Sequence, residues 1–312
     1  MNSLMGSDTF ATNAEQLVNE RIRSNKVAIV HGSSITDSAV SQDEIHDALT
    51  RLFLPLNVRV FSVLELSEAG MSDLFSSRAY DVIGLVGEAH EFGSARRRSS
   101  GGFRFHNDHA DGTDDMGSIL LSFAPKTRFK DARKYLGFSD AVVLCEAIER
   151  NWPLEVSRIV YHFFESLVVP SMLNIDLADV KHIAKGVGFA FNLSDDDHEK
   201  IIAMLPKDCF VARSAILHFS CKDNVRLGEI HTIAKSIAMK KGVVNTDQEL
   251  TSQSDAKKVI RKVNVKIGVR IVGDNCYVES KMAGRSAVSS ADSLGTFHDE
   301  KRINMTAMLF GI

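Results

Sequence analysis

Short apolar runs alternate with amphipathic stretches along the first half of the chain. The apolar runs occupy residues 26–30, 58–63, 80–86, 117–123 and 140–145. Apolar side chains at helical spacing, Ile45, Leu49 and Leu52, separate the first two runs. Strands that are apolar throughout are buried on both faces, as in a parallel sheet covered by helices. The pattern therefore predicts an α/β fold with a Rossmann-like parallel sheet in residues 26–150.

Residues 151–170 carry the strongest helical pattern of the sequence. Pro153 lies in the first turn, where proline is tolerated, and Pro170 ends the helix. The apolar positions, which cover more than one narrow stripe, are Trp152, Val156, Ile159, Val160, Phe163, Phe164 and Leu167. A helix of this kind is buried on more than one side. We predict a long central helix between two domains.

Residues 171–312 predict a second domain of α+β type. A helix opens near residue 176 and runs to about Lys185, where Gly186 offers a stop. Further along the chain, strands are predicted at 212–219 and 263–272 and a helix at 227–239. Residues 1–25 are predicted to form an N-terminal extension. Residues 279–302 are rich in serine, alanine and charged side chains, so their pattern predicts no definite secondary structure for the tail.

Composition and charge narrow the class of protein. The 312 residues are 44% hydrophobic and 25% charged, as is usual for a folded globular chain. A net charge of −3 gives no overall positive potential that would attract nucleic acid, so no nucleic-acid partner is expected. Cys145, Cys209, Cys221 and Cys276 stand far apart, which fits small core hydrophobes in a reducing compartment. Without a signal peptide or a membrane span, the chain is expected to be cytoplasmic.

Residues 87–116 are polar throughout and predict a long loop. Its first part is basic, through residues 96–98, and its last part is acidic. Loops of such length are functional or disordered. The side chains in it that can bind metal are His106, Asp108, His109 and Asp111. A surface loop accounts for them more simply than a metal site does, because a loop lacks the support that holds metal ligands in place.

The segment between the two central helices reads NIDLADV, residues 174–180. Taken alone it is a helix start, because Asp176 can cap free amides and the carboxylate of Asp179 favours the helix dipole. Its surroundings are a long apolar helix, a proline break and then N-x-D-x-x-D opening a second helix. This arrangement resembles the joint between the nucleotide domain and the activation domain of the FtsZ and tubulin superfamily. Residues 118–272 are similar to that family, and the first third is compatible in strand order.

The resemblance implies a tubulin/FtsZ-like fold, with a nucleotide-type domain at 26–150, a central helix at 151–170 and an activation-like domain at 171–312. In that family subunits stack head to tail, and the acidic loop of one completes the GTPase site of its neighbour. By resemblance, Asn174, Asp176 and Asp179 are the catalytic loop residues, which orient an attacking water. The implied partner is the chain itself or an FtsZ/tubulin-like relative, and the implied cofactors are GTP and Mg²⁺.

The phosphate-binding loops depart from that family. Its members hold phosphates with glycine runs after the first and third strands, because glycine lets backbone amides approach an anion closely. Neither run is present here, and Glu88 and Glu91 place negative charge where phosphate should lie. We therefore expect lost or altered GTP binding. The candidate cofactor-binding residues at these positions are His31, Gly32, Ser33, Ser34, Gly87 and Arg96.

Three functional hypotheses follow. The first is a cytoskeletal protein that assembles head to tail with a degenerate nucleotide pocket, a pseudo-GTPase. The second is an active GTPase in which the arginines at 96–98 replace glycine amides. The third is a metal-dependent hydrolase that uses His106, His109 and the nearby aspartates. Serine-hydrolase and P-loop functions have no motif behind them. Relatives of this fold serve cell division, plasmid segregation and cell shape, so the fold sets no process.

Overall fold

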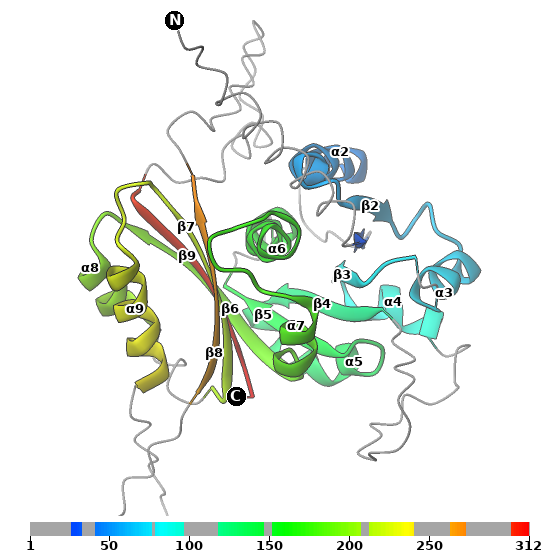
Figure 1. The fold of residues 1–312 in the computed structure, drawn as a ribbon. Coiled ribbons are helices and arrows are strands. Elements are labelled where there is room, and N and C mark those ends of the chain that lie inside the picture. The colour runs from blue at the N-terminus through cyan, green and yellow to red at the C-terminus, as the bar shows by residue number, and fades with distance from the viewer. Residues whose placement is uncertain are drawn as a thin grey trace, which may run out of the picture.

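The computed structural model describes residues 26–32, 41–76, 79–96, 118–146, 152–206, 212–239, 263–272 and 301–311. The strands are β1 Val27–His31, β2 Arg59–Ser62, β3 Val82–Val86, β4 Ile119–Pro125, β5 Ala141–Cys145, β6 Gly186–Asp195, β7 Ser214–Cys221, β8 Asn264–Ile271 and β9 Ile303–Phe310. Within these described ranges they form one nine-stranded sheet in the order β2-β1-β3-β4-β5-β6-β9-β7-β8 (Figure 1).

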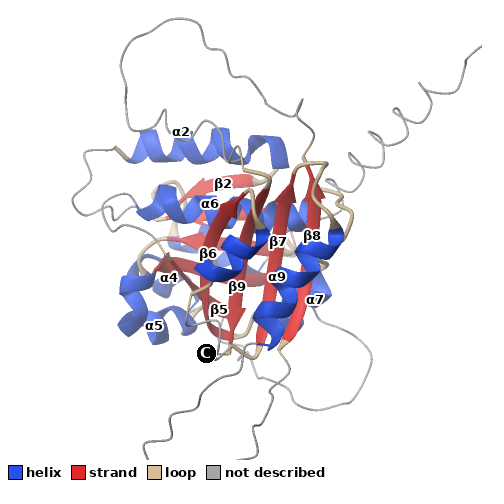
Figure 2. Ribbon diagram, turned by 90° about the vertical axis from the view of Figure 1, so that its left-hand side faces the viewer, coloured by secondary structure: helices blue, strands red, loops and turns tan. Residues whose placement is uncertain are grey.

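The sheet is parallel from β2 to β6 and mixed from β6 to β8. β1, β3 and β5 are buried along their whole lengths, which confirms the predicted parallel sheet. Ala141 of β5 pairs with Gly186 of β6, so the ladder continues without a break into the mixed part. There β9 runs antiparallel between β6 and β7, and β7 runs parallel to β8. In Figure 2 the mixed part of the sheet, β6, β9, β7 and β8, faces the viewer, and α9 lies in front of it.

Helices cover both faces of the sheet. They are α2 Gln42–Phe53, α3 Glu68–Ser76, α4 Ala89–Arg96, α5 Ala132–Leu136, α6 Trp152–Val168, α7 Leu177–Ile183, α8 His198–Met204 and α9 Leu227–Met239. The apolar side chains of α2, α6 and α7 join one core, and those of α4, α5, α8 and α9 join the core on the opposite face. α2 begins with a capping box, because Ser41 and Glu44 each accept a hydrogen bond from the backbone amide of the other.

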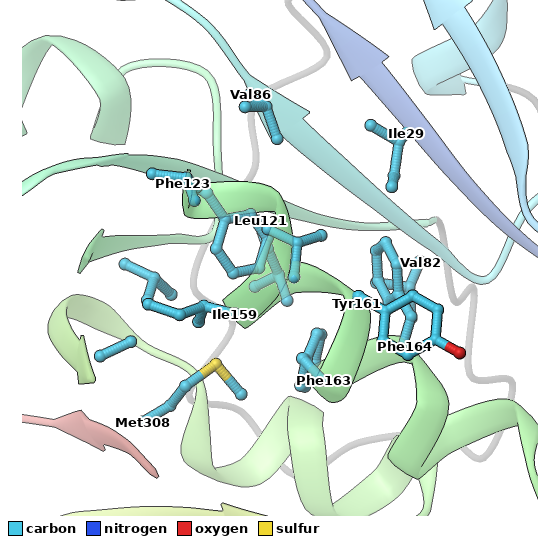
Figure 3. Packing of buried hydrophobic residues seen from close by; sticks show 14 of the residues in the cluster. Ile29, Val82, Val86, Leu121, Phe123, Ile159, Tyr161, Phe163, Phe164 and Met308 are labelled. Atoms are coloured by element: carbon cyan, nitrogen blue, oxygen red, sulfur yellow. The ribbon is translucent and has the colours of Figure 1, made fainter. Parts of the chain in front are cut away.

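The central helix is α6, and its observed bounds agree with the predicted helix. Its aromatic side chains face β1, β3 and β4, as the close-up of the core shows (Figure 3). Phe164 packs directly on the backbone of β3, where a Cβ at Gly84 would lie 2.9 Å from its ring. α6 also contacts α2 and all four strands of the mixed part of the sheet. It is therefore buried on more than one side, as its apolar pattern predicts.

The prediction of a loop over residues 87–116 was wrong in its first part, because Ala89–Arg96 form α4. Two local features favour this helix. The Phe92 side chain is buried in the core, and the Glu91 carboxylate accepts a hydrogen bond from the Glu88 amide at the helix start. The metal-capable residues His106, Asp108, His109 and Asp111, with the rest of the segment after residue 96, lie outside the described residues.

Cys145 and Cys221 are buried free thiols, which agrees with their predicted role as small core side chains, while Cys209 and Cys276 lie outside the described ranges. Among the helices that the structure describes, none combines the length and the apolar character needed to cross a membrane.

Candidate functional site

Two glycines meet where β1 and β3 end. Gly32 follows His31, the last residue of β1, and Gly87 follows Val86, the last residue of β3. The Gly32 amide donates a hydrogen bond to the Val86 carbonyl at 2.8 Å, so the two chain segments stay side by side beyond the strands. The carboxyl ends of parallel strands are the usual place for a ligand in an α/β sheet. We call this region, made of His31, Gly32, Gly87 and the start of α4, the strand-end site.

The Glu91 carboxylate occupies the space between these two glycines. A Cβ at Gly32 would lie 1.9 Å from its Oε2, and a Cβ at Gly87 would lie 2.8 Å from the same atom. Oε2 also accepts a hydrogen bond of 2.7 Å from the Glu88 amide. Glycines and a free helix amide are the features that admit a phosphate. Here they hold a carboxylate that belongs to the chain itself.

Two groups from neighbouring elements contact the strand-end site. Glu88 makes a salt bridge of 2.6 Å with Arg128, which lies after β4. The hydroxyl of Tyr135, on α5, donates to the Gly87 carbonyl at 3.1 Å. Burial raises the pKa of Tyr135 far above its ordinary value, so the hydroxyl keeps its proton. Arg128 and Tyr135 thus contact the strand-end site from neighbouring elements.

Both ring nitrogens of His31 lie within hydrogen-bonding distance of a neighbouring polar group. Its Nε2 lies 2.9 Å from Nδ1 of His46 on α2, and its Nδ1 lies 3.2 Å from the Gly32 carbonyl. Burial lowers the pKa of His31, and the nearby charge of His46 acts in the same direction. The carboxylates of Glu65 and Glu91 favour the charged ring but do not overcome burial. These effects favour the neutral ring of His31 at pH 7.

The lowered pKa of His31 predicts that the fold loses stability in weak acid. A lowered folded-state pKa means that, below about pH 6.5, the unfolded chain binds a proton that the folded chain does not. The free energy of unfolding should fall as the pH drops from about 7.5 to about 5.5. We expect a shallower pH dependence in His31→Gln, measured by urea unfolding. His231→Gln, which alters an exposed histidine, is the control and should keep the wild-type slope. An unchanged slope in His31→Gln would contradict this assignment.

The predicted catalytic loop is built by local hydrogen bonds. Asp176 is the N-cap of α7: its Oδ1 accepts from the Asp179 amide at 2.7 Å, and Asp179 Oδ2 accepts from the Asp176 amide at 3.4 Å. Asn174 Oδ1 accepts from the amide and the hydroxyl of Ser171, at 2.9 and 2.8 Å. Asp179 also makes a salt bridge of 2.5 Å with Lys266 on β8. We call residues 171–179 the acidic loop.

β8 anchors the acidic loop to the sheet. The Met172 amide donates to the Val269 carbonyl at 2.8 Å, and the Val269 amide donates to the Leu173 carbonyl at 2.9 Å. The Ile175 side chain is buried against Gly268, where a Cβ would lie 3.1 Å from its Cδ1. Asn174 and Asp176 remain exposed beside this anchor. The loop therefore presents polar groups on a fixed base.

The structure separates the predicted site residues into two groups at different parts of the sheet. His31, Gly32 and Gly87 meet at the carboxyl ends of the strands. Residues 172 and 173 of the acidic loop pair with Val269 of β8, which is the edge strand at the other end of the sheet order. Ser33 and Ser34 lie outside the described residues. Arg96 ends α4, and its side chain also lies outside them.

Sequence reasoning missed a polar cluster buried between α6 and the mixed part of the sheet. Its members are His162 and Glu165 of α6, His218 and Ser220 of β7, and Arg270 of β8. Burial alone would raise the pKa of Glu165, but hydrogen bonds from both imidazoles and the charge of Arg270 hold it well below its usual value. A histidine and a glutamate that interrupt an apolar helix were the available signal. We call this group the His–Glu cluster.

The comparisons with solved structures give the class of fold. A mutant FtsZ from M. jannaschii matches over 96% of this chain and 96% of that chain, with a TM-score of 0.54 at 9% identity. An empty FtsZ dimer from M. jannaschii matches over 95% of this chain and 92% of that chain, with a TM-score of 0.55 at 9% identity. Neither a protein-family model nor a curated protein matches the sequence.

A likeness of this kind establishes the fold. The chain has the FtsZ/tubulin-like fold, as the resemblance of the acidic loop and its surroundings implies. The match extends over almost the whole chain, well beyond residues 118–272, from which the resemblance was inferred. The fold does not carry the activity with it.

Proposed function

We propose that the chain is an FtsZ/tubulin-like cytoskeletal subunit that assembles head to tail, with copies of itself or with an FtsZ-like relative. Its strand-end site would not take GTP in the way the family does. Residues 26–150 would supply one contact surface of each subunit, and residues 171–312 would supply the other. The acidic loop would meet the strand-end site of the next subunit.

The observation that carries this proposal is the placement of the two sites. The strand-end site lies where β1 and β3 end, beside the β2 edge of the sheet, and the acidic loop lies on β8, the opposite edge strand. Two different surfaces of a subunit can join one copy to the next in a line, which is a heterologous contact. One of the similar FtsZ structures is a dimer. Exposed Asn174 and Asp176 give the loop polar groups for such a contact.

The carboxylate of Glu91 supports the second part of the proposal. It lies against Gly32 and Gly87 and accepts the Glu88 amide, so the polar features that would hold a phosphate already hold an anion. A phosphate at this position would have to displace Glu91 or meet its charge in a partly buried place, which is costly. The alternative of an active GTPase with an atypical loop requires this carboxylate to move.

A pair of substitutions at Asp176 tests the role of the loop in assembly. Asp176→Ala removes both the carboxylate and the helix cap, whereas Asp176→Asn removes the charge and keeps a good N-cap. If the carboxylate contacts a neighbour, both variants should lose most of the sedimentable assembly, by about fivefold or more, as expected for a charged group at an interface centre. Sedimentation with electron microscopy of the pellet measures the result.

The two variants also separate contact from folding. Asp176→Ala should cost about 1 kcal/mol of stability through the lost cap, while Asp176→Asn should cost little. If Asp176→Asn assembles like the wild type and only Asp176→Ala fails, the carboxylate acts as a helix cap and this part of the proposal is wrong. Glu199→Gln, at the exposed start of α8, serves as the control for a lost surface charge.

A further inference from the structure

Three side chains of the His–Glu cluster converge on one carboxylate oxygen of Glu165. Glu165 Oε2 lies 3.0 Å from His218 Nε2, 3.3 Å from Ser220 Oγ and 3.6 Å from His162 Nδ1. Ser220 Oγ also lies 3.3 Å from His218 Nε2. All the groups but Arg270 are almost completely buried. The convergence arises because α6 crosses β7, and residues 218 and 220 of β7 face the helix together.

These groups match the ligand set of a divalent transition metal. One ligand atom from each of His162, Glu165 and His218 lies within 4.8 Å of the other two. Ligands around a tetrahedral Zn²⁺ at about 2.1 Å from the ion lie roughly 3.4 Å from one another. The measured separations bracket this value, so small shifts of side chains would suffice. Two imidazoles and a carboxylate are a donor set that Zn²⁺ and Co²⁺ accept.

We propose that His162, Glu165 and His218 bind one divalent transition-metal ion, with the Ser220 hydroxyl or a water beside it as the fourth ligand. Imidazole binds metal in its neutral form. This site is independent of the strand-end site and of the proposed assembly, because it lies inside the subunit between α6 and β7.

Arg270 competes with the ion for Glu165. Its guanidinium contacts Oε1 of that carboxylate. A dication and a guanidinium together would leave excess positive charge in a buried place, which is unfavourable. Arg270 is the member with a path to solvent, since its side chain is 22% exposed. Metal binding should therefore turn Arg270 outward, and a neutral residue at this position should strengthen binding.

Titration of the full-length protein with CoCl₂, after treatment with EDTA and its removal, tests the proposal. The wild type should develop a visible ligand-field absorption band at one Co²⁺ per chain and a higher melting temperature. Arg270→Gln should bind Co²⁺ at least tenfold more tightly. His218→Ala and His162→Gln should lose the band. His231→Gln, on the exposed side of α9, is the control and should keep it.

The opposite results overturn the proposal. If neither the wild type nor folded Arg270→Gln gains an absorption band or a shift in melting temperature at stoichiometric Co²⁺, the cluster is an ion-pair network that only fastens α6 to the sheet. Should His218→Ala fail to fold, His162→Gln combined with Arg270→Gln decides the matter. A band that persists in the folded double variant would place the metal elsewhere and would also reject the site.

Discussion

Replacement of Glu91 by glutamine should raise the affinity of the chain for inorganic phosphate and for GTP by at least tenfold. The Glu91 carboxylate lies against Gly32 and Gly87, where a phosphate would enter. Two unit charges about 4 Å apart repel by about 4 kcal/mol at an effective dielectric constant of about 20, and a third of that is a tenfold change. Glutamine keeps an oxygen that accepts the Glu88 amide, so α4 should still start in the same place.

Equilibrium binding of a fluorescent GTP analogue and calorimetric titration with phosphate measure this effect. The wild type should show no saturable binding at millimolar nucleotide. Glu199→Gln removes a carboxylate from the first turn of α8 and should leave binding as it is in the wild type. Saturable micromolar binding by the wild type with Mg²⁺ would instead favour the GTPase hypothesis. Equal binding by the wild type and Glu91→Gln would show that this carboxylate does not block the site.

Removal of the Phe164 ring should destabilise the fold by about 3–5 kcal/mol, the usual range for a buried phenylalanine replaced by alanine. Phe164 is fully buried, and its ring lies on the β3 backbone at Gly84. It also contacts Phe53 of α2, with ring centroids 6.2 Å apart. The lost ring would leave a cavity between the central helix and the sheet that neighbouring groups fill only in part.

Urea unfolding followed by circular dichroism gives the comparison. Phe129→Ala is the matched control, because this phenylalanine is 64% exposed and should change stability by less than about 0.5 kcal/mol. A Phe164→Ala protein as stable as the wild type would mean that α6 does not pack on the sheet as described. The assignment of α6 as the central helix would then fail.

The elements that sequence reasoning identified are those with an uninterrupted pattern. The buried strands β1, β3 and β5 and the central helix α6 all read as apolar stretches, and their predicted positions agree with the structure. β6 and β9 were missed, although β9 is buried along its whole length. β9 follows a long polar stretch, and its place between β6 and β7 depends on pairing with residues far away in the chain. The local pattern of apolar and polar residues does not reveal pairing between strands that are far apart in the chain.

The candidate site was predictable in part for a similar reason. Spacing alone indicated that Asp176 caps a helix with Asp179, and the capping box is present. The sequence also placed negative charge near the ends of β1 and β3. That Glu91, rather than Glu88, lies against both glycines depends on α4, which was predicted as loop. The His–Glu cluster joins α6, β7 and β8 across the fold, so only the tertiary structure brings its members together.

Sedimentation of the purified wild-type chain, alone and mixed with an FtsZ, with and without GTP and Mg²⁺, tests the central claim most directly. The claim is that this subunit assembles end to end while Glu91 holds the place of the phosphate. We predict that the chain pellets as filaments to the same extent in the presence and in the absence of GTP and Mg²⁺. A chain that stays in the supernatant in every mixture, or that pellets only when GTP occupies its strand-end site, would contradict the account.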